Sequence, residues 1–123
     1  MDTWRGRILV ICKDGKRLSG LVRILNQYGA GRFDIVKVTD LNGEVSLHRA
    51  SVPPVIIILS LMEAEDAVWG LYRVRSHLPK AKVIVQLNMY DQGKALMLLR
   101  LGAYEVFSSL NELWDIVTRA STL

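Results

Sequence analysis

The chain has 123 residues, of which 50% are hydrophobic and 23% are charged, and its formal net charge is +4 at pH 7. This composition is typical of one folded domain and excludes a disordered chain, and no apolar run reaches the ~20 residues of a transmembrane helix. The single cysteine, Cys12, excludes an internal disulfide, and the first residues lack the features of a signal peptide. We therefore expect a cytoplasmic protein that does not bind a membrane.

The first half of the chain alternates between strand and helix patterns. Residues 7–11 form an apolar run typical of a buried strand, and Asp14 is a suitable N-cap for a helix that Gly29 ends. Residues 33–38 alternate between apolar and polar, which predicts a strand near the edge of a sheet. A short helix is predicted over residues 44–50, after a turn signal.

The second half opens with the most apolar segment of the chain. Residues 55–59 are mostly β-branched, which predicts a strand buried on both faces, and Ser60 follows this run. Apolar spacing and caps predict the later elements, which are a helix over 65–78, a strand over 83–87, a helix over 92–101, a strand over 104–107 and a last helix opened by a capping box at Ser109. Five strands alternating with five helices predict a three-layer α/β/α sandwich around a parallel sheet, in one domain over 1–123.

Several short segments share their order and spacing with one family of signalling domains. They include the apolar run at 7–11, Asn42-Gly43-Glu44, the run at 55–62, and Leu101-Gly102-Ala103 before the fifth strand. Together they resemble the receiver domain of two-component response regulators, which has the CheY-like fold. Met89-Tyr90-Asp91 is similar to the matching loop in receivers of LuxR/NarL-type regulators. The resemblance implies a sheet with the flavodoxin-like strand order 2-1-3-4-5.

The resemblance also implies a set of site positions. Receivers transfer a phosphoryl group to their own aspartate, and this aspartate and an acidic pair hold Mg²⁺ through oxygen ligands. A Thr or Ser and a Lys contact the phosphoryl oxygens. At these positions this chain has Cys12 and Lys13 for the acidic pair, Ser60 for the acceptor, Leu87 or Asn88 for the Thr or Ser, and Ser109 for the Lys.

Each of these departures weakens the phosphoryl site. Ser60 cannot form an acyl phosphate, Lys13 places a cation where Mg²⁺ would bind, and Cys12 is a soft ligand unsuited to Mg²⁺. Asp14 is acidic but stands one residue late, where it is suited to cap the first helix. We therefore expect a degenerate pseudo-receiver that is not an enzyme, needs no cofactor or Mg²⁺, and signals without phosphorylation.

Two surfaces are candidates for function. Lys13, Ser60, Ser108 and Ser109 together predict a neutral-to-basic cleft at the strand ends, and the alternative function is therefore a sensor of a small anion or nucleotide. In receivers, the face formed by the fourth helix, fifth strand and fifth helix commonly mediates dimerisation or partner docking. Here that face would carry Met89, Tyr90, Met97, Tyr104 and Trp114.

Of this second surface, we expect Tyr90, Tyr104 and Trp114 to be exposed, and we give less weight to Trp69 and Tyr72 on the third helix. The face is expected to bind a protein partner or a second copy of the chain. By analogy with regulators of this type, the output is expected to be transcriptional. DNA would then be bound only through an additional domain beyond Leu123.

Overall fold

A five-stranded parallel sheet forms the centre of the molecule, in a computed structural model that describes residues 6–29, 33–39, 55–62 and 64–121. The strands are β1 (Gly6–Ile11), β2 (Phe33–Val38), β3 (Ile56–Met62), β4 (Lys82–Leu87) and β5 (Glu105–Phe107). The helices are α1 (Gly15–Gly29), α3 (Ala64–His77), α4 (Gln92–Arg100), the short 3-10 helix η1 (Leu110–Glu112) and α5 (Leu113–Ser121). The strand order β2-β1-β3-β4-β5 confirms the predicted topology.

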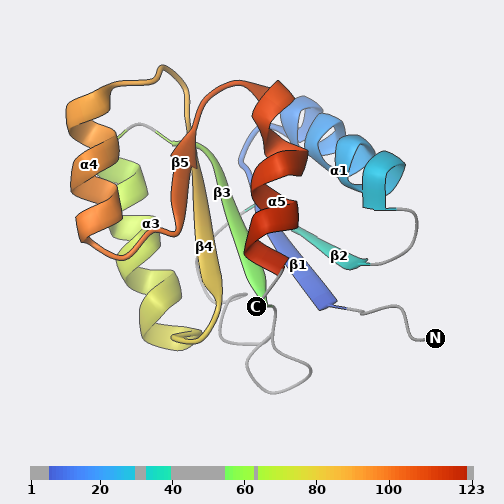
Figure 1. The fold of residues 1–123 in the computed structure, drawn as a ribbon, viewed down its shortest axis with the longest axis horizontal. Helices are drawn as coiled ribbons and strands as arrows, with labels where there is room; N and C mark the ends of the chain where they lie inside the picture. The colour runs from blue at the N-terminus through green and yellow to red at the C-terminus, as the bar shows by residue number, and fades with distance from the viewer. Residues whose placement is uncertain (1–5, 30–32, 40–54, 63, 122–123) are drawn as a thin grey trace.

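Helices cover both faces of this sheet, as the sandwich prediction requires. α1 and α5 lie on one face, and α3 and α4 lie on the other (Figure 1). The strand residues alternate between the two resulting cores: Ile8 and Val10 pack toward α1 and α5, and Leu9 and Ile11 toward α3 and α4. Residues 56–59 of β3 are fully buried because the strand is in the middle of the sheet.

The described part of the chain contains four α-helices and η1. The fifth helix, predicted over 44–50, lies outside the described residues, as does the Asn42-Gly43-Glu44 segment. None of the described helices is long and apolar enough to cross a membrane.

The largest correction to the predicted boundaries concerns Ser60. The prediction ended the central strand at this residue, but β3 continues to Met62, and Ser60 is paired in register with Gln86 of β4. The polar Ser60 interrupts the apolar run, and the pairing with β4 changes register between Ser60 and Met62, so the pattern of the run alone did not predict where the strand ends. Ser60 therefore lies within the sheet and not on a loop beyond it.

The end of the chain also differs in detail from the prediction. The Ser109 hydroxyl accepts a hydrogen bond from the Asn111 backbone N–H at 3.3 Å, so this residue caps η1 and not an α-helix. The α-helix starts only at Leu113. Its inward residues are nevertheless those predicted, since Leu113, Ile116 and Val117 are buried.

Candidate functional site

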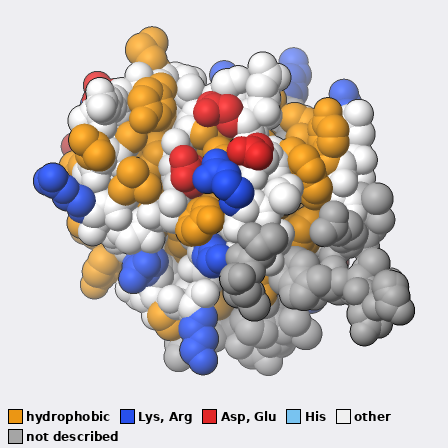
Figure 2. Space-filling view, in the orientation of Figure 1, with side chains coloured by type: hydrophobic (Ala, Val, Ile, Leu, Met, Phe, Trp, Pro, Cys, Tyr) orange, Lys and Arg blue, Asp and Glu red, His pale blue; other side chains and the backbone are white. Residues whose placement is uncertain are grey.

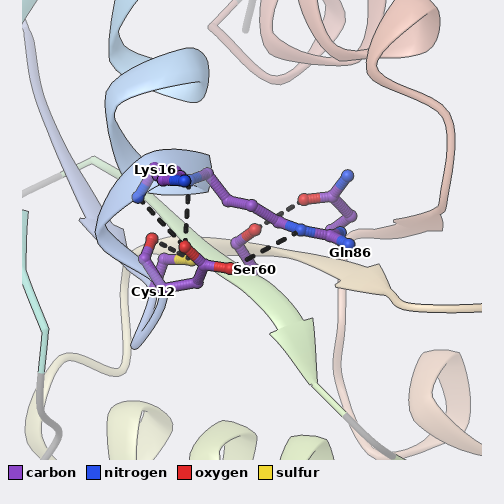
Figure 3. A network of polar contacts seen from close by, with 6 residues as sticks. Cys12, Lys16, Ser60 and Gln86 are labelled. Atoms are coloured by element: carbon purple, nitrogen blue, oxygen red, sulfur yellow. Dashed lines mark hydrogen bonds and ion pairs between the residues drawn. The ribbon is translucent and has the colours of Figure 1, made fainter.

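The loop between β1 and α1 is held by hydrogen bonds between residues close in the sequence. The Asp14 carboxylate accepts hydrogen bonds from the backbone N–H groups of Lys16, at 3.0 Å, and Arg17, at 3.4 Å. The buried thiol of Cys12 donates to the Asp14 carbonyl oxygen at 3.4 Å (Figure 3). Asp14 is therefore the helix cap that the sequence predicted, and one of its carboxylate oxygens satisfies the otherwise unpaired first turn of α1.

A buried chain of hydrogen bonds joins the last three strands at the centre of the predicted phosphoryl site. The Ser60 hydroxyl donates to Gln86 Oε1 at 2.5 Å (Figure 3). Gln86 Nε2 in turn donates to the Ser108 carbonyl oxygen at 2.9 Å. Ser60 is only 2% exposed and Gln86 only 4% exposed. The hydroxyl at the acceptor position is therefore already used inside the protein.

Gln86 is the site residue that the sequence analysis missed. It is the polar member of an otherwise apolar strand end, Val83-Ile84-Val85-Gln86-Leu87, and it lies on the same face of the sheet as Ile84. A buried amide needs hydrogen-bond partners, so its position in a buried strand was a usable signal. The partner itself was not predictable, because it depends on the strand register between β3 and β4.

The other residues predicted at the phosphoryl site do not converge on one point. Leu87 is 2% exposed and packs in the core under α3 and α4, on the opposite face of the sheet from Gln86. Asn88 and Lys13 are exposed, and Ser109 caps η1. No side-chain nitrogen or oxygen that is buried within the described residues is left without a hydrogen-bond partner. Among the described residues, the predicted anion cleft therefore contains no buried hydrogen-bond donor that is free to bind an anion.

The described residues do not fit the Mg²⁺ ion that the resemblance implies. Mg²⁺ prefers oxygen ligands in octahedral geometry. Cys12 supplies a buried sulfur, and the Ser60 hydroxyl is already bonded. Asp14 supplies one carboxylate, which caps α1 and lies 3.9 Å from the Arg17 guanidinium. Within the described ranges no group of three His, Cys, Asp or Glu side chains is placed to hold a metal.

The predicted aromatic residues of the interaction face have two different environments. Tyr90 is 53% exposed, as predicted, but Tyr104 and Trp114 are half-buried, so the prediction that they are exposed was wrong. The Trp114 ring stacks on Tyr28 of α1 with ring centroids 5.9 Å apart, because α1 and α5 are neighbours on one face of the sheet. The Tyr104 ring carries the Lys82 ammonium 5.1 Å from its centroid.

The α4–β5–α5 face is nevertheless partly apolar. Leu96, Met97 and Leu99 of α4 are exposed, and so is Met89 in the loop before the helix. On β5 and α5, Arg119 lies 3.6 Å from the Glu105 carboxylate and 3.3 Å from that of Asp115. Figure 2 shows apolar side chains over α4 beside a group of acidic and basic side chains over β5 and α5.

Comparison with known proteins shows the fold. No protein-family model matches the chain, and no curated protein matches it. A response regulator from Thermotoga maritima superposes with a TM-score of 0.77 at 15% identity, over 94% of this chain and 97% of that one. The NtrC4 receiver domain, solved as a beryllofluoride-activated dimer, gives 0.75 at 22% identity, over 93% and 94%.

One further structural match is to a protein of a different kind. The pilus assembly protein CpaE from Caulobacter crescentus gives a TM-score of 0.72 at 18% identity, over 96% of this chain and 92% of that one. At these identities the likeness establishes a receiver-type fold, and a shared fold does not carry function with it.

Proposed function

We propose that this chain is a pseudo-receiver, a signalling module with the receiver fold that acts without phosphorylation. The observation that carries the proposal is the hydrogen-bond chain from Ser60 through Gln86 to Ser108. It occupies the acceptor position with a buried, internally bonded hydroxyl, where a receiver has an exposed carboxylate. The poor fit of Cys12 and Lys13 to Mg²⁺ supports the same conclusion.

Such a module would act by binding another protein. The α4–β5–α5 face supports docking because Leu96 and Leu99 place apolar surface beside the charges of Glu105 and Arg119. Apolar contacts supply most of the binding free energy in a protein interface, and flanking charges select the partner. The proposed setting is the cytoplasm, with a transcriptional output by analogy with LuxR/NarL-type regulators.

The proposal is tested with phosphoryl donors and analogues. The chain is incubated with Mg²⁺ and either acetyl phosphate or beryllofluoride, and is followed by intact mass and by ¹H–¹⁵N spectra. We expect no added mass and unchanged spectra. The NtrC4 receiver, treated identically, is the positive control because its structure was solved with beryllofluoride. A Mg²⁺-dependent adduct on this chain would overturn the proposal.

The same preparation also tests the sensor alternative. Ligands that bind only the folded state raise the unfolding temperature. We expect no shift with a panel of nucleotides and inorganic anions, because the Ser60 hydroxyl is buried and donates to Gln86, and the Ser109 hydroxyl serves as the cap of η1. Stabilisation by one of these ligands at micromolar concentration would favour the sensor over the docking module.

A further inference from the structure

The outer face of α3 carries two large aromatic side chains that the core does not use. Trp69 is 73% exposed and Tyr72 is 68% exposed, more than any other aromatic side chain among the described residues. Their rings contact each other edge to face, with centroids 6.5 Å apart. Isolated exposed apolar residues are ordinary, but an aromatic pair on one helix face is typical of a binding surface.

The exposed residues of α3 follow the spacing of a helix-pairing seam. Glu65, Trp69, Tyr72 and Ser76 are exposed and recur at intervals of four, three and four residues. This is the a/d spacing of a two-helix seam, on the side opposite the residues that α3 buries against the sheet. The seam therefore presents exposed side chains at the spacing that a second helix would contact.

The charges beside the seam show which helix fits it. Asp66 and Arg73 are seven residues apart, so they lie on the same flank of α3, one near each end of the aromatic pair. Neither has an ion-pair partner within the described part of the chain. An acidic end and a basic end on one flank are complementary to a reversed copy of the same helix.

We infer that α3 pairs antiparallel with α3 of a second copy of this chain, about a two-fold axis between Trp69 and Tyr72. Residue numbers that face each other in this arrangement sum to about 141, as in Trp69 opposite Tyr72 of the partner subunit. On the flank, Asp66 lies opposite Arg73 of the partner subunit, and the symmetry axis repeats the pair. The interface is self-complementary, as a two-fold dimer requires.

A groove beside the seam gives the partner's aromatic rings a place to enter. It has a volume of about 620 Å³ and lies between α3 and the residue after α4, with Val68, Leu71 and Leu101 in its wall. Arg75 also lines it and donates to the Gly102 carbonyl oxygen at 3.1 Å, which ties the end of α4 to α3. Aromatic side chains in such pockets are the usual anchors of protein interfaces.

This inference names a partner for the docking module and in that respect rests on the proposed function. It leaves the α4–β5–α5 face of each subunit available to another protein. One helix pair buries less than the ~1,200 Å² of a standard stable interface, so the dimer is expected to be transient. The two proposals fail separately, because a phosphoryl adduct does not bear on α3, and a strict monomer does not restore the phosphoryl site.

The test is sedimentation velocity of the full chain over a range of concentrations up to ~1 mM, where transient dimers are detectable. Wild type is expected to associate reversibly. Asp66→Arg and Arg73→Asp each place like charges across the axis twice, and each variant alone should dimerise about tenfold more weakly. Mixed in equal amounts, the two variants should form a heterodimer, because every flank pair is then of opposite charge.

The mixing step separates the interface from effects on folding, since a misfolded chain would not recover association with a second variant. Trp69→Ala should also weaken the dimer by about tenfold or more. Leu96→Ala is the matched control, because it removes an exposed apolar side chain of α4 that lies outside the α3 seam. A monomeric wild type, failure of the mixture to associate, or equal loss in the Leu96 variant would overturn the inference.

Discussion

Ser60 and Gln86 are the two polar side chains fully buried in the described core, and each satisfies the other. A buried hydroxyl or amide that loses its partner bears the full cost of its desolvation. The hydrogen bond to Gln86 therefore explains how a polar side chain can be buried at position 60, where a receiver has its acceptor carboxylate. It also joins β3 to β4 and β4 to the residue after β5, so the strands that would carry a phosphoryl switch are tied together.

At this scale we expect Ser60→Ala to lower the free energy of unfolding by about 1–3 kcal/mol, because it leaves Gln86 Oε1 buried without a donor. Ser19→Ala is the control: this serine is exposed on α1, and its removal should change stability by less than about 0.5 kcal/mol. Urea unfolding measures both. Equal effects in the two variants would show that the Ser60 hydrogen bond contributes nothing.

The coupling within the pair is a separate expectation. A double-mutant cycle compares Ser60→Ala, Gln86→Ala and the double variant. The loss of unfolding free energy in the double variant should differ from the sum of the two single losses by about 1 kcal/mol, because each of the three variants removes the same hydrogen bond. The free energies of unfolding in urea supply the cycle. Simple additivity would mean that Gln86 is held by Ser108 alone.

At the scale of elements, a glycine after one helix and a glycine within another have opposite roles. Gly102 follows α4 with φ of +111°, and a Cβ there would lie 2.5 Å from the Arg75 guanidinium. Only glycine adopts this backbone region without strain, so Gly102 sets the turn from α4 into β5. Gly20 is within α1 with an ordinary helical conformation, and a Cβ on it would meet no atom within 4 Å.

We therefore expect Gly102→Ala to destabilise the chain by about 1–3 kcal/mol through backbone strain. Gly20→Ala should instead stabilise it by about 0.5–1 kcal/mol, because alanine has the higher helix propensity and the smaller unfolded-state entropy. Thermal unfolding followed by circular dichroism measures both effects, as a lower unfolding temperature for Gly102→Ala and a higher one for Gly20→Ala. A neutral Gly102 variant would mean that the turn relaxes to a negative φ.

The elements themselves were largely predictable, because their signals are local. The cap at Asp14, the buried run of β3 and the edge alternation of β2 depend only on nearby residues. The exposure of Trp114 was not predictable in this way, because it depends on α1 placing Tyr28 against its ring. The same holds for Gln86, whose partners come from other strands. The environments of Trp114 and Gln86 depend on contacts between elements, and the periodicity of apolar residues within one element does not predict such contacts.

For the molecule as a whole, the sheet couples two separate apolar cores. One lies under α1 and α5 and the other under α3 and α4, and β1, β3 and β4 contribute side chains to both. Neither pair of helices can stay folded without the strands, and the strands need both covers to bury both faces. The chain should therefore unfold as one cooperative unit, as small single domains usually do.

Two tryptophans on opposite faces provide the measurement. The chain's third tryptophan, Trp4, is replaced in both reporter variants. Trp69 is on α3 and Trp114 on α5, so variants that keep only one of these two report on the two faces separately. We introduce Leu25→Ala, which empties a fully buried site under α1 and should cost about 2–4 kcal/mol. Both tryptophans should then report the same shifted urea midpoint, measured at low micromolar concentration so that α3 is unpaired. If Trp69 kept the wild-type midpoint while the Trp114 midpoint fell, the α3–α4 layer would be folding independently, and the single-unit interpretation would fail.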